Sequence, residues 1–401
     1  MEDLILPVWP IPLTDTMRIA LALVLSGLAG EVFNRYLRLP RICGYSLAGL
    51  LLGPFLFGWF DAQDSHFFRI LIDLALALLL FELGHRVDLH WFRTNRWIIP
   101  SSIAEASLTY LGAYLVLRLF DASPELAATV AAIAINTSPA VVMRVATELR
   151  SEGQVTQRLF VLTALNVLYS VVLSKLIVGY MHGAFRHDWS AALFHPVYLL
   201  LGSLFAGILI ALAFRWLRRG FDLSDEQAVV ILFGLLLLSL SLLQAFLLPT
   251  MLAPLLAGVM LKNSDRRPLH WPRHFGTAGG VLVILLFVLT SATLTRDAVL
   301  MGGMTALALI AVRLAGKGIA VGIFGPASGL SARQSLALGL ALMPMSALAF
   351  LLVDDIRLLY PAFGAQVGGI IFSMIAVTQL LGPICVQWAL RFCNEFIERK
   401  H

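Results

Sequence analysis

Three polar residues followed by a proline interrupt an apolar run in the first half of the chain. They are Asn136, Thr137, Ser138 and Pro139. The run itself, residues 126–145, is long enough to cross a bilayer. Proline removes a backbone donor and disfavours a helical conformation at Ser138. We therefore predict a helix broken at mid-membrane, where freed backbone groups must be buried by protein or line a polar cavity.

A second interrupted apolar run lies in the other half of the chain. Residues 334–353 contain Pro344 and Ser346 near their middle. Two interrupted spans, one in each half, form the sequence pattern that points to the binding site of a secondary transporter. We predict that the two breaks form one site.

Two basic residues fall inside a further apolar run. Arg313 and Lys317 are one helical turn apart and share a helix face. A cation at mid-bilayer costs about 3 kcal/mol on insertion scales, so a functional role is the first hypothesis. The alternative is structural: either side chain neutralises the helix ends that meet at the breaks. A third basic residue, Lys175, could extend to the outer surface instead.

Two carboxylates are expected at membrane depth, Asp73 and Glu105, whereas Glu31 and Glu82 lie nearer the ends of their runs. Burial disfavours the charged form of a carboxyl group, which suits a group that carries protons. Asp73 and Glu105 are therefore the candidate proton carriers.

The composition places these residues in a polytopic helical membrane protein. The chain has 401 residues, of which 59% are hydrophobic and only 13% are charged. Its charges lie between long apolar runs, which excludes a nucleic-acid-binding surface as the origin of the net charge of +5. We find no nucleophile and base arranged for catalysis and no metal-binding spacing, so we expect no enzyme, cofactor or metal site.

Apolar runs predict about thirteen transmembrane helices. Their ranges are 17–34, 42–60, 67–86, 97–119, 125–146, 157–181, 196–217, 227–247, 249–262, 275–294, 299–324, 334–353 and 363–392. Arginine and lysine are concentrated in the loops that follow odd-numbered spans. By the positive-inside rule the N-terminus is outside and the C-terminus is cytoplasmic. We expect one membrane domain over residues 1–401, with no soluble regulatory domain.

The sequence resembles the monovalent cation/proton antiporter superfamily, closest to its Kef-type and sodium/proton exchanger branch. The likeness rests on the motifs LPRICGYSLAG at 39–49, LLFELG at 79–84, TSPAVV at 137–142, LAGV at 256–259 and AGK at 315–317. The resemblance implies two inverted repeats with two crossing broken helices, and core and dimerisation subdomains interleaved along the chain. It also implies a homodimer in a bacterial cytoplasmic membrane that exchanges sodium or potassium for protons.

One departure from the family pattern concerns the sixth span. The family carries its essential acid there, but this chain has Asn166 and Val167 at the matching pair, and residues 160–175 contain no carboxylate. An asparagine binds a cation but cannot carry a proton. The alternative function is therefore a transporter-like protein without proton coupling: a sensor, a complex subunit, or a uniporter or channel for another solute.

These residues predict one midplane site formed by Asn166, the break at Thr137 and Ser138, and Lys317. With no acid expected beside it, Lys317 would lose its proton readily in a low-dielectric site. Proton release from Lys317 on cation entry would give electroneutral exchange.

Overall fold

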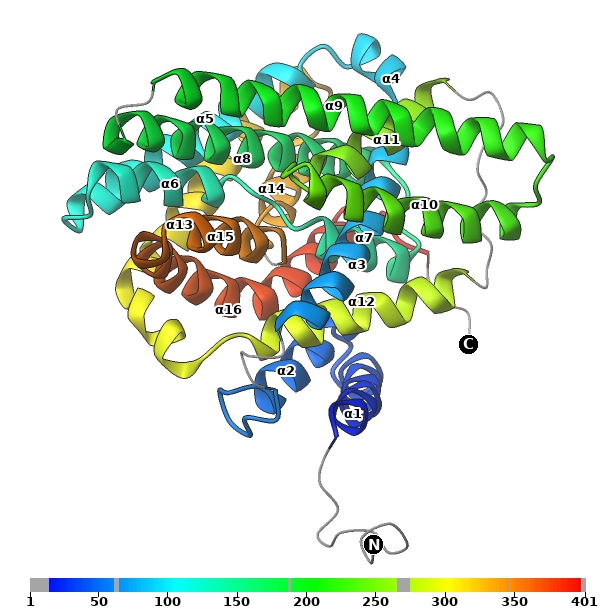
Figure 1. Cartoon of the computed structure of the whole chain (residues 1–401), viewed down its shortest axis with the longest axis horizontal. Helices are drawn as coiled ribbons and strands as arrows, with labels where there is room; N and C mark the ends of the chain where they lie inside the picture. The colour runs from blue at the N-terminus through cyan, green and yellow to red at the C-terminus, as the bar shows by residue number, and fades with distance from the viewer. Residues whose placement is uncertain (1–13, 61–64, 187–188, 265–274, 346, 398–401) are drawn as a thin grey trace, which may run out of the picture.

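The regular elements are all helices in the computed structural model, which describes residues 14–60, 65–186, 189–264, 275–345 and 347–397 (Figure 1). The first half contains α1 (Asp15–Tyr36), α2 (Arg41–Leu52), α3 (Ser65–His85), α4 (Leu89–Thr94), α5 (Ile98–Leu119), α6 (Pro124–Ala134), α7 (Pro139–Leu149) and α8 (Gln154–Arg186). The second half contains α9 (Trp189–Gly220), α10 (Asp225–Ala245), α11 (Leu252–Ser264), α12 (Phe275–Ala292), α13 (Arg296–Ala327), α14 (Ala332–Ala341), α15 (Ala347–Leu359) and α16 (Pro361–Phe392). The all-helical membrane fold predicted from the sequence is confirmed.

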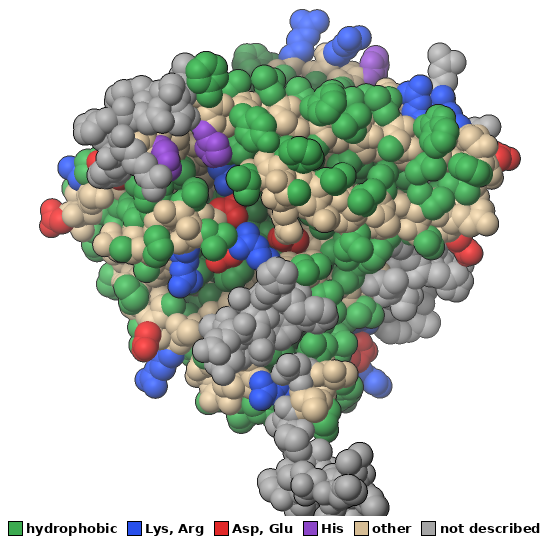
Figure 2. Space-filling view, in the orientation of Figure 1, with side chains coloured by type: hydrophobic (Ala, Val, Ile, Leu, Met, Phe, Trp, Pro, Cys, Tyr) green, Lys and Arg blue, Asp and Glu red, His purple; other side chains and the backbone are tan. Residues whose placement is uncertain are grey.

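Seven apolar helical stretches within the described residues are long enough to cross a membrane. One of them combines α6 and α7; the others lie in α1, α8, α9, α10, α13 and α16. Exposed apolar side chains cover α9 and α10, including Phe205 and Val230, which are suited to contact lipid (Figure 2). The chain is therefore an integral membrane protein, while the number of crossings, about thirteen, stays a prediction.

The two interrupted runs are confirmed as broken helices. The first run forms α6 and α7, separated by an extended segment that ends at Ser138. The second forms α14 and α15, and α14 ends at Ala341, shortly before Pro344. The prediction of one span over residues 42–60 is wrong in its length, because α2 ends at Leu52 before Gly53 and Pro54. Proline has no backbone donor, so the helix does not continue through this point.

The order of elements around the breaks repeats. A long helix, a broken helix and a long helix follow one another as α5, α6/α7 and α8, and again as α13, α14/α15 and α16. The two sets pack against each other chiefly where α13 meets α5. In Figure 1, α9 and α10 lie on one side of the molecule, α1 and α2 lie on the other, and α7 and α14 lie between them.

Glycines allow two pairs of helices to approach closely. A Cβ atom at Gly258 of α11 would lie 2.1 Å from the carbonyl oxygen of Phe81 in α3. A Cβ atom at Gly49 of α2 would lie 2.4 Å from the carbonyl oxygen of Val288 in α12. Small residues permit such backbone contact in membrane proteins, where lipid offers no hydrophobic drive for helix association.

Candidate functional site

The two helix breaks contact each other through the backbone. The amide of Ser138 donates to the carbonyl of Pro344 at 2.8 Å, and the hydroxyl of Thr137 donates to the carbonyl of Leu342 at 2.9 Å. The Ser138 hydroxyl accepts from the amide of Val141 at 3.3 Å and so caps α7. Pro139 is the first residue of α7, where its missing donor is harmless. The predicted meeting of the two breaks is therefore present in the structure.

Arg313 of α13 joins the ends of α6 and α14. Its guanidinium donates to three carbonyl groups: those of Ala134 at 2.6 Å, Asn136 at 2.7 Å and Met343 at 3.2 Å. These carbonyls lie at or just after the C-terminal ends of the two half-helices, where a positive charge is stabilising. The contacts of Arg313 therefore match the structural role raised from the sequence.

Lys317 has a different set of partners. Its ammonium forms a completely buried ion pair with Glu105 of α5, and donates to the carbonyl of Ile135 at 3.0 Å and the hydroxyl of Thr137 at 3.2 Å. The expectation that no acid lies beside Lys317 is wrong. The pair forms because α5 and α13 approach closely: a Cβ atom at Gly316 would lie 3.1 Å from the backbone of Thr109, one turn beyond Glu105.

Thr137 connects this pair to Asn166. Its hydroxyl accepts from Lys317 and from the side-chain amide of Asn166, the latter at 3.2 Å, while it donates to Leu342. One donor and two acceptor positions are all that a hydroxyl offers. Asn166 of α8 thus lies one side chain away from Lys317, as predicted.

Several oxygens in this cluster have no partner among the described residues. They are Oδ1 of Asn136, Oδ1 of Asn166 and Oε2 of Glu105, and the side-chain nitrogen of Asn136 is also unpartnered. All three residues are completely buried. Buried polar atoms without hydrogen bonds are unfavourable, so such atoms suit a site that exchanges its ligand. Protein oxygens of this kind can replace the hydration shell of a monovalent cation.

Asp73, the other candidate proton carrier, lies elsewhere. One oxygen of Asp73 accepts from the side-chain amide of Gln244 at 3.2 Å and lies 4.0 Å from Nε of Arg69. Arg69 also pairs with Asp354 and Asp355, and Asp355 pairs with Lys175 at 2.9 Å. We call these five charged residues the outer charge cluster, since they lie toward the side predicted to be outside: Arg69, Asp73, Lys175, Asp354 and Asp355.

Three other residues named from the sequence lie outside the midplane cluster or outside the described residues. Lys175 reaches toward the side predicted to be outside, where its ammonium is held in an ion pair with the partly exposed Asp355. Glu82, near the end of α3, pairs with Arg86, which directly follows the last residue of this helix. Ser346, predicted at the second break, lies outside the described residues.

The sequence also contained a signal that our prediction did not use. Thr163, Ser170 and Ser174 recur with Asn166 at intervals of three or four residues along α8, so they share one helix face. Their hydroxyls are buried and have no hydrogen-bond partner among the described residues. A stripe of small polar residues along an apolar helix is a pattern that marks a polar path or a helix contact.

Comparison with known proteins identifies the family and the fold. The family model described as "Sodium/hydrogen exchanger, transmembrane" matches residues 20–392. Two structures of the sodium proton antiporter MjNhaP1 from Methanocaldococcus jannaschii share the fold. The structure at pH 8 has a TM-score of 0.70 at 19% identity, covering 94% of this chain and 97% of that one. The electron-microscopy structure has a TM-score of 0.72 at 18% identity, covering 95% of this chain and 98% of that one.

No match is found among curated protein sequences. The family model nevertheless spans nearly the whole chain, including both broken helices and α13. The chain therefore belongs to the transmembrane sodium/hydrogen exchanger family.

Proposed function

We propose that the chain exchanges sodium or potassium for protons, and that Glu105 and Lys317 together replace the acid that the family resemblance places in the sixth span. The single observation that carries this proposal is the completely buried Glu105–Lys317 ion pair beside the two helix breaks. Charged residues at membrane depth are unfavourable unless paired, and they mark ion and proton pathways.

Charge balance gives the stoichiometry. In the proton-loaded state the carboxylate of Glu105 is neutralised by the ammonium of Lys317. An entering cation binds the carboxylate of Glu105, and Lys317 releases its proton to water and becomes a neutral amine. The site has the same net charge in both states, so exchange is electroneutral, with one proton moved for one cation.

The neighbouring neutral groups complete the proposed cation site. Asn136 and Asn166 each offer an unpartnered side-chain oxygen, and the carbonyl of Ile135 becomes available when Lys317 withdraws. Arg313 stays in place because its side-chain hydrogen bonds are all to backbone carbonyls, one at the end of α6 and one in each of the two breaks. In this proposal Arg313 keeps the two breaks together while Lys317 titrates.

A flux assay in proteoliposomes tests the proposal. A cation gradient imposed with sodium, potassium or lithium in turn should drive proton movement detected by a trapped pH dye. The expected result is proton flux with sodium or potassium, unaffected by collapse of the membrane potential with valinomycin where potassium is present on both sides. The same preparation with Glu105→Gln should show no cation-driven proton flux.

The second candidate function is a transporter-like protein without proton coupling. The absence of any carboxylate in α8 between Phe160 and Lys175 favours it. In that reading Glu105 and Lys317 only hold α5 against α13, and the wild-type chain moves no protons with any of the three cations. Tracer uptake of the cation without proton movement would identify a uniporter or channel, whereas no uptake would favour a sensor or a complex subunit.

The family and the distribution of basic loops support three further proposals. The chain forms a homodimer, lies in a bacterial cytoplasmic membrane, and has its N-terminus outside. Native mass spectrometry with retained lipid should give the mass of two chains. A cysteine placed at Arg93, in a background without the native cysteines, should react with membrane-impermeant reagent only from the cytoplasmic side.

A further inference from the structure

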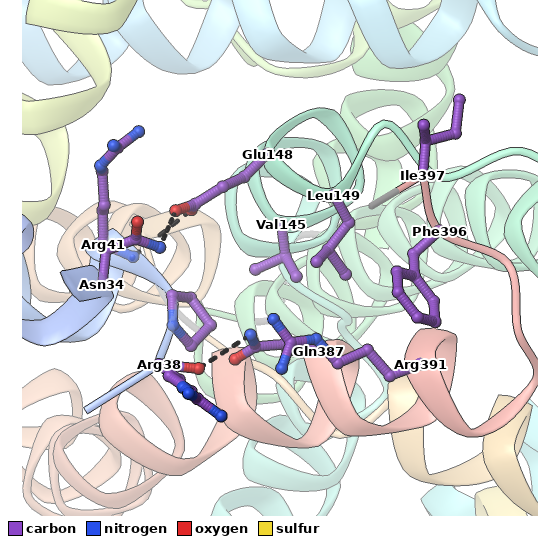
Figure 3. Close-up of a pocket in the computed structure, with 11 residues that line it drawn as sticks. Asn34, Arg38, Arg41, Val145, Glu148, Leu149, Gln387, Arg391, Phe396 and Ile397 are labelled. Atoms are coloured by element: carbon purple, nitrogen blue, oxygen red, sulfur yellow. Dashed lines mark hydrogen bonds between the residues drawn. The ribbon is translucent and has the colours of Figure 1, made fainter. Parts of the chain in front are cut away.

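A polar pocket of about 460 Å³ lies at the end of α7 opposite the first helix break, on the face predicted to be cytoplasmic. It is formed where the junction of α1 and α2 meets the end of α7, the last turns of α16 and the residues that follow α16 (Figure 3). Its polar lining includes Arg38, Arg41, Glu148, Gln387 and Arg391. The proposed exchange mechanism does not use this pocket.

Two of its three arginines have no partner of opposite charge among the residues that the structure describes. Arg41 pairs with Glu31 at 3.1 Å, and Glu148 accepts from the side-chain amide of Asn34 at 2.8 Å. The guanidinium groups of Arg38 and Arg391, in contrast, make no hydrogen bond or ion pair with the described residues. The pocket therefore holds two arginines, one from the α1–α2 junction and one from α16, that have no ion-pair partner among the described residues, although the carboxylate of Glu148 also lies in its lining.

The wall that carries Arg38 is built with a constrained backbone. Arg38 has a φ of +55°, a left-handed conformation that residues other than glycine rarely adopt. Its carbonyl accepts a hydrogen bond from the buried side-chain amide of Gln387 at 3.0 Å, as Figure 3 shows. This bond fixes the α1–α2 junction against α16, so the distance between the walls that carry Arg38 and Arg391 is set by the fold.

We propose that this pocket binds a ligand that carries a phosphate group, held between Arg38 and Arg391. Arginine binds phosphate through paired, charge-assisted hydrogen bonds, which a lysine cannot reproduce. Val145, Leu149 and Phe396 line another part of the pocket and can contact an apolar portion of the ligand. The volume accommodates a phospholipid headgroup or a soluble phosphate compound up to the size of a mononucleotide, and both share the phosphate chemistry.

The position of the pocket gives the ligand a way to act on transport. Val145, Glu148 and Leu149 belong to α7, which begins at Pro139 directly after the first helix break. A bound ligand would join this half-helix to the junction of α1 and α2. If the proposed exchange function holds, on which this consequence alone rests, occupancy should slow exchange because α7 is held in place.

Binding is tested on the purified full-length chain without any transport measurement. Isothermal titration calorimetry with inorganic phosphate and with adenosine monophosphate forms the soluble arm. Native mass spectrometry after incubation with phosphatidylglycerol or phosphatidylcholine forms the lipid arm. We expect binding in at least one arm, and a loss of about tenfold or more in affinity when Arg38→Gln and Arg391→Gln are combined. Arg93→Gln, an exposed arginine of α4, is the matched control and should bind as the wild type does.

A second variant tests binding in the pocket by steric obstruction, without removing any charge. Ile397→Trp places a larger side chain at the exposed rim of the pocket, keeps every arginine, and should weaken binding in the same arm. Binding in one arm identifies the source of the phosphate. Absence of binding in both arms, or equal binding by the wild type and the double arginine variant, would overturn the proposal. A failure of the exchange assay leaves this binding result unaffected, so the two proposals can fail separately.

Discussion

The midplane ion pair and the outer charge cluster both join helices, and they differ in how completely water is excluded. The side chains of Glu105 and Lys317 are 0% exposed, whereas those of Arg69, Lys175, Asp354 and Asp355 keep between 15% and 30% exposure. Removing one partner of a buried pair costs about 3–5 kcal/mol because a charge is left without a counter-charge. An exposed pair contributes about 0–1 kcal/mol and is screened by salt.

This difference in water exclusion distinguishes the midplane pair, which can exchange ions, from the outer charge cluster, which holds helices together. A proton or cation that enters the midplane pair changes the charge of a dehydrated site, so its effect on the surrounding helices is large. The outer charge cluster contains more carboxylates than basic groups, yet four of its five side chains are partly exposed to water and several partners share its charge. We therefore assign ion exchange to the midplane pair and helix contact to the outer charge cluster.

Replacing Lys317 should produce the largest effect. Lys317→Met leaves Glu105 buried without a counter-charge, so we expect a loss of stability of about 3–5 kcal/mol and no proton coupling. Adding Glu105→Gln to this variant should restore most of the stability, because neither residue is then charged, but not the exchange. Thermal unfolding in nanodiscs and proton flux in proteoliposomes measure the two quantities. Intact coupled exchange in Lys317→Met would make the lysine structural.

Introducing an acid at Asn166 should have the next largest effect. Asn166→Asp adds a negative charge one side chain away from the Glu105–Lys317 pair, through Thr137. The site then needs one more positive charge, so we expect a second ion per cycle, a shifted pH profile and electrogenic exchange. Currents recorded on a solid-supported membrane should appear in this variant and be absent in the wild type, and Asn166→Gln serves as the uncharged control.

Asp73→Asn tests whether Asp73, rather than Glu105, carries the proton. An asparagine keeps an acceptor for the side-chain amide of Gln244, so we expect coupled exchange to continue with a modest change in rate. Proton flux compared with that of Glu105→Gln decides between the two carboxylates. If Asp73→Asn abolishes exchange and Glu105→Gln does not, the roles of the two regions are reversed.

Asp355→Asn should have the smallest effect. Asp355 pairs with both Arg69 and Lys175, but Arg69 also has Asp354, so one of its contacts survives. We expect a destabilisation of no more than about 1 kcal/mol, which diminishes further at high salt. Unfolding temperature measured over a series of salt concentrations provides the test, and a large effect independent of salt would show that the outer charge cluster is dehydrated too.

The fold could be predicted from local sequence because its main irregularities are encoded locally. Pro139 and Pro344 mark the two helix breaks, and Ser138 followed by Pro139 is a typical start of a helix. The same signal indicates that the Ser138 hydroxyl caps α7, whereas our prediction placed Ser138 only in the ion site. Burial of Arg313 and Lys317 followed from their place in an apolar run.

The pairing of Glu105 with Lys317 could not be predicted in the same way. The two residues are 212 positions apart, and their contact depends on the packing of α5 against α13 at Gly316. No local sequence pattern in α5 or α13 specifies which other helix packs against it. Asp73 and Glu105 looked equivalent in the sequence. Only the arrangement of helices places Glu105 at the breaks and Asp73 in the outer charge cluster.

Proton release on cation binding tests the central claim most directly. Sodium or potassium is added to purified, weakly buffered protein, and a pH-indicator dye reports the protons set free. Our account predicts release of about one proton per chain from the wild type and none from Lys317→Met, since exchange at a single ion pair conserves charge. Equal release from both proteins, or no release from the wild type with either cation, would contradict it.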